Sequence, residues 1–119
     1  MSDFKLSSRS LGILETVDEE IQRVVKRAIE ITIVDFGVSS GYRTAAEQHI
    51  LFEKKLSRCD GYEKLSHHQS GRAVDLFACK KGSAVWDREH SALVAVAVMQ
   101  AATEKNVRLK WGGFFNVFF

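Results

Sequence analysis

Residues 66–75 have the sequence Ser-His-His-Gln-Ser-Gly-Arg-Ala-Val-Asp, and a short apolar stretch follows them directly. Because a Ser/Gly cluster precedes this apolar stretch, the pattern predicts a strand that begins near Ala73. Alternate side chains of a strand share one face, so Asp75 is expected on the same face as Ala73 and Phe77. A carboxylate among residues that favour burial needs a hydrogen-bond donor, a cation or a metal as its partner.

His68 is the candidate partner of Asp75. It lies seven positions earlier, across a turn that contains Gly71, and a chain that folds back at this turn brings the two side chains together. Imidazole nitrogen and carboxylate oxygen are both ligands that zinc prefers, and a catalytic zinc usually has three protein ligands and a water. A structural hydrogen bond between histidine and aspartate fits the spacing equally well, so both interpretations stay open at this point.

The composition is that of an ordinary globular protein. The chain has 119 residues, enough for a single domain with a real core, and 45% of them are hydrophobic. The net charge of +2 comes from scattered lysines and arginines, which is not the pattern of a nucleic-acid-binding protein. No apolar run reaches the length of a signal peptide or a membrane span, so we expect a cytoplasmic protein. Cys59 and Cys79 are expected to be free thiols.

The order of the predicted elements indicates a small α+β domain around a mainly antiparallel sheet. Helices are predicted over residues 7–14, 18–31, 45–56 and 88–106, and strands over residues 33–39, 73–79 and 107–111. Thr16 is expected to begin the second helix, in a capping box with Glu19. Residues 92–102 are apolar almost all round, so we expect the last helix to be buried on several sides.

Arg43 is a further candidate functional residue. It lies at a predicted corner between a strand and a helix, directly before Thr44, which can cap the helix together with Glu47. Side chains at such corners of a rigid scaffold often carry function. A solvated surface charge is equally consistent with this position.

The motif Ser66-x-His68-x-x-Gly71-x-Ala73-x-Asp75 resembles the zinc motif of the D-alanyl-D-alanine carboxypeptidase and L-alanyl-D-glutamate peptidase family, in particular that of its phage endolysins. The likeness extends over nearly the whole chain. Four further segments resemble the family in the same order, namely residues 6–17, residues 24–36, residues 40–44 with Gln48, and residues 111–113. The resemblance implies the α+β fold that this family shares with the hedgehog signalling domain.

The resemblance also implies roles for five residues. His68 and Asp75 match two zinc ligands of the family, and Arg43 matches the arginine that stabilises the developing oxyanion of the substrate carbonyl. Ser66 and Gln48 match positions that line the substrate cleft. The implied cofactor is Zn²⁺, and the implied substrate is the peptidoglycan stem peptide, with cleavage of the L-Ala–D-Glu bond favoured. Such an endolysin needs help, for example from a holin, to reach the cell wall.

The sequence departs from the family near its end. The family has a third ligand, a histidine, soon after the Trp-Gly-Gly segment, and an acidic general base shortly before that histidine. Here no histidine follows His90, and no aspartate or glutamate follows Glu104. We therefore expect a peptidase-like domain over residues 1–119 that is truncated at its C-terminus, holds zinc weakly or not at all, and is inactive or impaired.

Two interpretations from other classes remain. A site with Arg43 and no catalytic base fits a non-catalytic module that binds wall peptide without cutting it. The phenylalanine-rich residues 114–119 fit a prophage remnant that self-associates, because an uncovered apolar strand is a docking surface. Peptide binding that survives zinc removal would favour the module, and a concentration-dependent dimer would favour the remnant.

Overall fold

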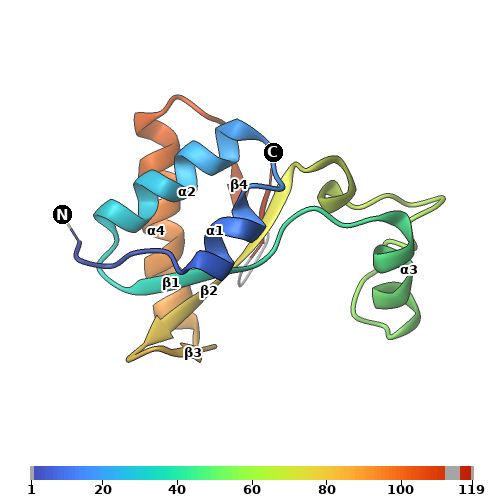
Figure 1. Cartoon of the computed structure of the whole chain (residues 1–119), viewed down its shortest axis with the longest axis horizontal. Coiled ribbons are helices and arrows are strands. Elements are labelled where there is room, and N and C mark those ends of the chain that lie inside the picture. Colours follow the sequence, from blue (N-terminus) through green and yellow to red (C-terminus); the bar gives the residue numbers. More distant parts are fainter. Residues whose placement is uncertain (1, 112–115, 119) are drawn as a thin grey trace.

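The computed structural model describes residues 2–111 and 116–118, and it has the predicted α+β architecture (Figure 1). The helices are α1 (Ser8–Leu14), α2 (Glu19–Ile31), α3 (Ala45–Glu53) and α4 (Arg88–Glu104), together with the short 3₁₀ helix η1 (His67–Ser70). The strands are β1 (Asp35–Ser40), β2 (Ala73–Lys80), β3 (Ser83–Val85), β4 (Lys110–Trp111) and β5 (Asn116–Phe118). In the described part of the chain, no helix is long and apolar enough to cross a membrane.

The sheet is antiparallel throughout and is organised around β2. Strand β1 pairs with one edge of β2, while β3 and β5 share the other edge, and β5 also pairs with β4. The backbone of β5 is therefore paired on both sides, which differs from the expected uncovered strand at residues 116–118. Of the other residues in that expectation, 114, 115 and 119 lie outside the described part of the chain, as do Gly112 and Gly113.

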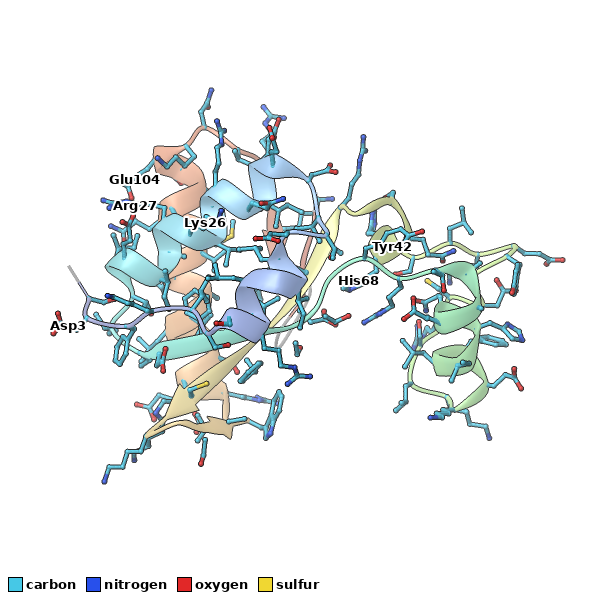
Figure 2. All side chains as sticks on the ribbon, viewed as in Figure 1. Asp3, Lys26, Arg27, Tyr42, His68 and Glu104 are labelled. Atoms are coloured by element: carbon cyan, nitrogen blue, oxygen red, sulfur yellow. The ribbon has the colours of Figure 1, made fainter. Side chains whose placement is uncertain are left out.

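The apolar core lies between the sheet and two helices. On α2, the apolar residues recur at helical spacing and form one buried face, and this face packs against α4. The core residues include Ile21, Val24, Val25, Ala28, Phe36, Val38, Val74, Leu76, Val94, Val98 and Ala101. At the surface, Arg27 of α2 pairs with Glu104 at the end of α4, with 3.2 Å between Nη2 and Oε1 (Figure 2). Such exposed pairs contribute little, and burial of the apolar side chains holds the two helices together.

Two expectations about the helices are corrected by the structure. Helix α4 is buried along one face only, because Val96 is 60% exposed and Met99 is 37% exposed on its other side. The N-cap position of α2 is occupied by Asp18 rather than Thr16, and the Asp18 side chain makes no capping hydrogen bond. The Thr16 hydroxyl instead donates to the carbonyl of Ile13 at 2.6 Å and accepts the N–H of Tyr42 at 3.0 Å. The chain makes one more turn after α1, and this turn places Thr16 beside the corner that carries Arg43.

Residues 44–66, which we call the α3 arm, stand apart from the rest of the molecule (Figure 1). The arm begins with the predicted capping box, in which Thr44 and Glu47 exchange hydrogen bonds. Helix α3 ends at Glu53, earlier than predicted, and Lys55 follows with a positive φ of 62°. Apolar side chains such as Ile50 remain exposed on the arm, while the polar Gln48 is fully buried. The arm is therefore held by polar contacts rather than by an apolar core.

Candidate functional site

The turn between η1 and β2 brings His68 back to Asp75, as the sequence predicts. Gly71 ends η1 in the left-handed conformation, with φ of 73°, which glycine adopts without strain. Its carbonyl accepts the N–H of Asp18 at 2.9 Å, and this bond ties the turn to the start of α2. The resulting distance between His68 Nε2 and Asp75 Oδ1 is 3.3 Å.

A backbone carbonyl fixes the orientation of the His68 ring. The ring is buried, and its Nδ1 lies 2.7 Å from the carbonyl oxygen of Gly41. Because a carbonyl can only accept a hydrogen bond, Nδ1 must carry a proton and donate it. In neutral histidine this leaves the lone pair of Nε2 directed toward the carboxylate of Asp75. Metal-binding histidines in proteins are commonly held by the same kind of bond on their other nitrogen.

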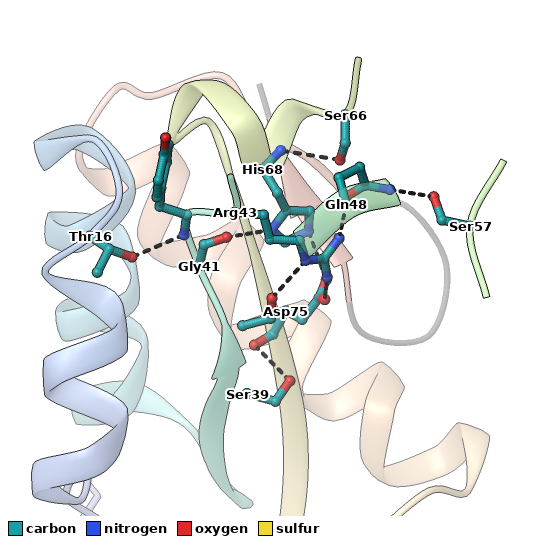
Figure 3. Close-up of polar contacts among 11 residues, drawn as sticks. Thr16, Ser39, Gly41, Arg43, Gln48, Ser57, Ser66, His68 and Asp75 are labelled. Carbon is teal, nitrogen blue, oxygen red and sulfur yellow. Dashed lines mark hydrogen bonds and ion pairs between the residues drawn. The ribbon is translucent and has the colours of Figure 1, made fainter. Parts of the chain in front are cut away.

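Arg43 joins the same cluster from the corner between β1 and α3. Its Nη2 contacts Asp75 Oδ2 at 2.9 Å, its Nε donates to Ser40 Oγ at 3.2 Å, and its Nη1 donates to Gln48 Oε1 at 3.1 Å (Figure 3). The side chains of Arg43 and Asp75 are only 18% and 14% exposed. Each of the three guanidinium nitrogens therefore has a polar partner, and the group is held close to the His68–Asp75 pair.

Gln48 and Ser66 have contacts that the sequence did not predict. Gln48 is completely buried, and its Nε2 donates to Ser57 Oγ at 2.8 Å and to the carbonyl of Cys59 at 2.9 Å. Its side chain thus has no free surface for a substrate in this conformation. Ser66 is the N-cap of η1, and its Oγ accepts the N–H of His68 at 3.3 Å. A contact between either residue and substrate stays a prediction.

Sequence reasoning missed the contributions of Ser40 and Gly41. Both belong to the stretch that carries Arg43, but the sequence alone does not show that the Gly41 carbonyl binds His68. The Ser40 hydroxyl likewise contacts Arg43 only because β1 ends at this corner. The pairing of β1 with β2 explains why Ser40 is at the site, because Ser40 lies opposite Asp75 in this ladder.

The donor atoms of His68 and Asp75 fit a zinc ion. Zinc bonds of about 2.0–2.1 Å in tetrahedral geometry separate neighbouring ligand atoms by about 3.3–3.4 Å. The observed separation between Nε2 and Oδ1 is 3.3 Å. Within residues 2–111 and 116–118, no group of three or more histidine, cysteine, aspartate or glutamate side chains is placed to hold a metal. Cys59 and Cys79 are free thiols, as predicted.

Comparison with known proteins agrees with the fold and the motif. The model of the family "Phage L-alanyl-D-glutamate peptidase" matches residues 1–117. The L-alanyl-D-glutamate peptidase of Escherichia phage T5 is 32% identical over 114 residues, which cover 95% of this chain and 82% of that protein. The crystal structure of the Serratia marcescens L-Ala D-Glu endopeptidase ChiX superposes with a TM-score of 0.86 at 29% identity, over 97% of this chain and 90% of the other. The chain therefore belongs to the phage L-alanyl-D-glutamate peptidase family.

Proposed function

We propose that this chain is a zinc-dependent peptidoglycan peptidase directed at the L-Ala–D-Glu bond, with His68 and Asp75 as zinc ligands. The observation that carries the proposal is the approach of Nε2 and Oδ1 to 3.3 Å while Nδ1 is bound to the Gly41 carbonyl. This arrangement brings one nitrogen donor and one oxygen donor to a separation that suits two ligands of one zinc ion. Zinc bound there would polarise the scissile carbonyl and lower the pKa of its water.

Arg43 supplies the fixed positive charge of the proposed site. Arginine side chains carry a delocalised positive charge, and the contacts of Arg43 to Ser40, Gln48 and Asp75 hold this charge in position before substrate arrives. A charge that is already oriented stabilises the negative charge that develops on the substrate carbonyl without further reorganisation. Arg43 is therefore the proposed oxyanion-stabilising residue.

Gln48 and Ser66 are proposed to act through these residues. Gln48 accepts from Arg43 and donates to the loop at residues 57–59, so it fixes the direction of the guanidinium group. Ser66 caps the turn that carries His68. Both would be positioning residues, and a direct role in lining the substrate cleft would require Gln48 to leave its buried place.

The number of ligands sets the expected strength of the site. His68 and Asp75 are two donors, whereas a catalytic zinc usually has three protein ligands. We expect the chain of 119 residues to hold zinc more weakly than a three-ligand site and to cleave peptide slowly. A third donor would strengthen zinc binding, whereas rapid cleavage would also need a general base.

Cleavage of a synthetic stem peptide tests this proposal. The chain is incubated with L-Ala–D-Glu–Lys–D-Ala at fixed free zinc, and products are followed by mass spectrometry over long times. We expect slow release of L-alanine, abolished by a chelator and by His68→Ala, and lowered by about 10²–10³ in Arg43→Ala. Arg58→Ala, which removes an exposed arginine of the arm, is the control. Peptide binding with no product at saturating zinc would contradict the proposal and favour the non-catalytic module.

A further inference from the structure

A groove of about 530 Å³ lies between α1 and the beginning of α3. We call it the α1 groove. Its lining includes Arg9 and Gly12 of α1, Ser40, Tyr42 and Arg43 of the corner, and Glu47 of α3. The volume is within the usual range for sites that hold small ligands, about 300–1,000 Å³.

The α1 groove reaches the proposed catalytic centre through Arg43. This residue lines the groove and also contacts Asp75 at 2.9 Å. A peptide whose scissile carbonyl lies at Arg43 can therefore continue into the groove. The corner itself is anchored to α1, because the N–H of Tyr42 donates to Thr16 Oγ1 at 3.0 Å. The two walls of the groove are thus fixed relative to each other at its base.

Gly12 keeps the α1 wall of the groove flat. It lies inside α1, where glycine is less favourable than alanine because it loses more backbone conformational freedom when the helix forms. A Cβ atom added at Gly12 would meet no atom within 4 Å, so packing does not require a glycine here. The open space beside Gly12 belongs to the groove. A longer side chain at this position would fill the groove and leave the fold intact.

The charge available in the groove is positive. Arg9 is exposed and forms no ion pair with any residue in the described part of the chain. Glu47, on the opposite wall, accepts the N–H of Thr44 at 2.9 Å in the capping box, and this backbone bond is the main cause of the lowered pKa of Glu47. Its carboxylate therefore stays ionised and is held against its own helix. The lining has two arginines, Arg9 and Arg43, against this one carboxylate, so the groove has a net positive charge and Arg9 is the arginine that is not already paired with Asp75.

We propose that the α1 groove holds the D-glutamate side of the stem peptide and that Arg9 pairs with the free carboxylate of this residue. The inference rests on the proposed function, because it takes the substrate from there. A glutamate that continues the peptide through one of its two carboxyl groups keeps the other as a carboxylate. Arginine recognises carboxylates through paired hydrogen bonds. The groove would thereby select an acidic peptide and place its preceding bond at Arg43.

Titration of the metal-free chain with two peptides tests the proposal. The first is L-Ala–D-Glu–Lys with glutamate linked through its side-chain carboxyl group, and the second has the remaining carboxylate amidated. Calorimetry in the presence of chelator should show that Arg9→Gln weakens binding of the acidic peptide about two- to fivefold, as expected for an exposed ion pair. Arg23→Gln, which removes an exposed charge from α2, should leave the dissociation constant unchanged. Neither change should affect the amidated peptide.

A graded pair of variants tests the space beside Gly12. Gly12→Gln should weaken binding of both peptides, while Gly12→Ala should weaken it less, and both should unfold at or above the wild-type temperature. Equal effects of Arg9→Gln and Arg23→Gln, or full binding by Gly12→Gln, would overturn the proposal. If the chain cleaves peptide but these variants have no effect, the proposed peptidase function stands and the proposed role of the α1 groove is wrong. If the variants affect binding as expected but the chain never cleaves peptide, the role of the groove stands and the peptidase function is wrong.

Discussion

The core and the α3 arm are held together by different forces. In the core, α2, α4 and the sheet bury apolar side chains such as Ile21 and Val98 completely. In the arm, apolar side chains such as Ile50 and Leu56 are exposed, and the buried side chain is the amide of Gln48. Apolar burial is strong and non-directional, whereas hydrogen bonds contribute less each and depend on geometry. The core thus determines the overall stability, and the arm determines local geometry.

This difference explains where the candidate site lies. Asp75 is on β2 in the core sheet, and Arg43 is at the point where the arm begins. His68 lies in η1, where the chain returns from the arm to β2 (Figure 2). The core fixes one half of the cluster, and the hydrogen bonds of the arm fix the other half. Changes in the two regions should therefore have separable effects.

The largest expected effect is the loss of a core side chain. Ile21→Ala removes a fully buried side chain and should lower the free energy of unfolding by about 2–5 kcal/mol. Ile50→Ala removes the same side chain from the arm, where it is 51% exposed, and should change stability by less than about 0.5 kcal/mol. Denaturant unfolding measures both. Similar losses in the two variants would show that the arm has an apolar core of its own.

The next effect is local to the arm. Gln48→Ala removes the acceptor of Arg43 and the donor to Ser57, and each buried polar group left without a partner costs about 1–3 kcal/mol. Hydrogen exchange should become faster over residues 57–64 and stay unchanged in α2. Gln100→Ala, at an exposed position of α4, is the matched control. Uniform loss of protection over the whole chain would contradict a local role for Gln48.

A smaller effect is expected from the cap of α3. Thr44→Ala removes the hydroxyl that accepts the N–H of Glu47 at 3.1 Å, and the loss of such a cap costs about 1 kcal/mol. Exchange of the first-turn amides of α3 should increase. Thr103→Ala is the control, because that hydroxyl bonds within α4 at its last turn. If α3 amides were equally protected in both variants, the capping box would have no role in holding the arm.

The smallest expected effect is a loss of local stability in the arm at acid pH. The pKa of Asp60 is lowered mainly because its carboxylate accepts the backbone N–H of Lys64, and also those of Tyr62 and Glu63. Since the folded pKa lies below the unfolded one, this stabilisation is present above the ordinary carboxyl pKa of about 4 and is lost as pH falls through the folded value. The protection of amides 62–64, measured as exchange relative to the intrinsic rate at the same pH, should therefore fall in acid.

Asp60→Asn should remove this pH dependence, because an amide oxygen still accepts hydrogen bonds but does not titrate in this range. Asp87→Asn changes a carboxylate that caps α4, so it should leave the arm unaffected. An unchanged acid response in Asp60→Asn would assign the effect to another group.

The sequence predicts those parts of the fold that depend on local pattern. The Thr44–Glu47 capping box, the buried face of α2 and the turn at Gly71 follow from residue types at fixed spacing, and the structure confirms each of them. Strand β3 was not predicted, because it has only three residues and no periodicity can be read from so short a segment, and for β5 the sequence favoured an uncovered strand rather than a paired one. Their pairing depends on contacts with β2.

Burial of individual side chains depends on tertiary packing, which the sequence pattern alone does not determine. The apolar helix α4 looks fully buried in sequence, but no element covers Val96, which is 60% exposed. On α3 the polar Gln48 is buried and the apolar Ile50 is exposed, which is the reverse of what residue type alone predicts. The approach of His68 and Asp75 was predicted, but the role of the Gly41 carbonyl was not, because a backbone carbonyl leaves no signature in sequence.

The central claim is that His68 and Asp75 form a metal site where the arm and the core meet. The zinc affinities of the wild-type chain and three single variants test this claim. Competition with a chromophoric chelator measures zinc binding by the wild-type chain, His68→Ala, Asp75→Asn and His67→Ala, which changes the exposed neighbour of His68. We predict measurable binding by the wild-type chain and His67→Ala, and loss of binding in the other two. Equal zinc binding by all four proteins, or none by the wild-type chain, would contradict the claim.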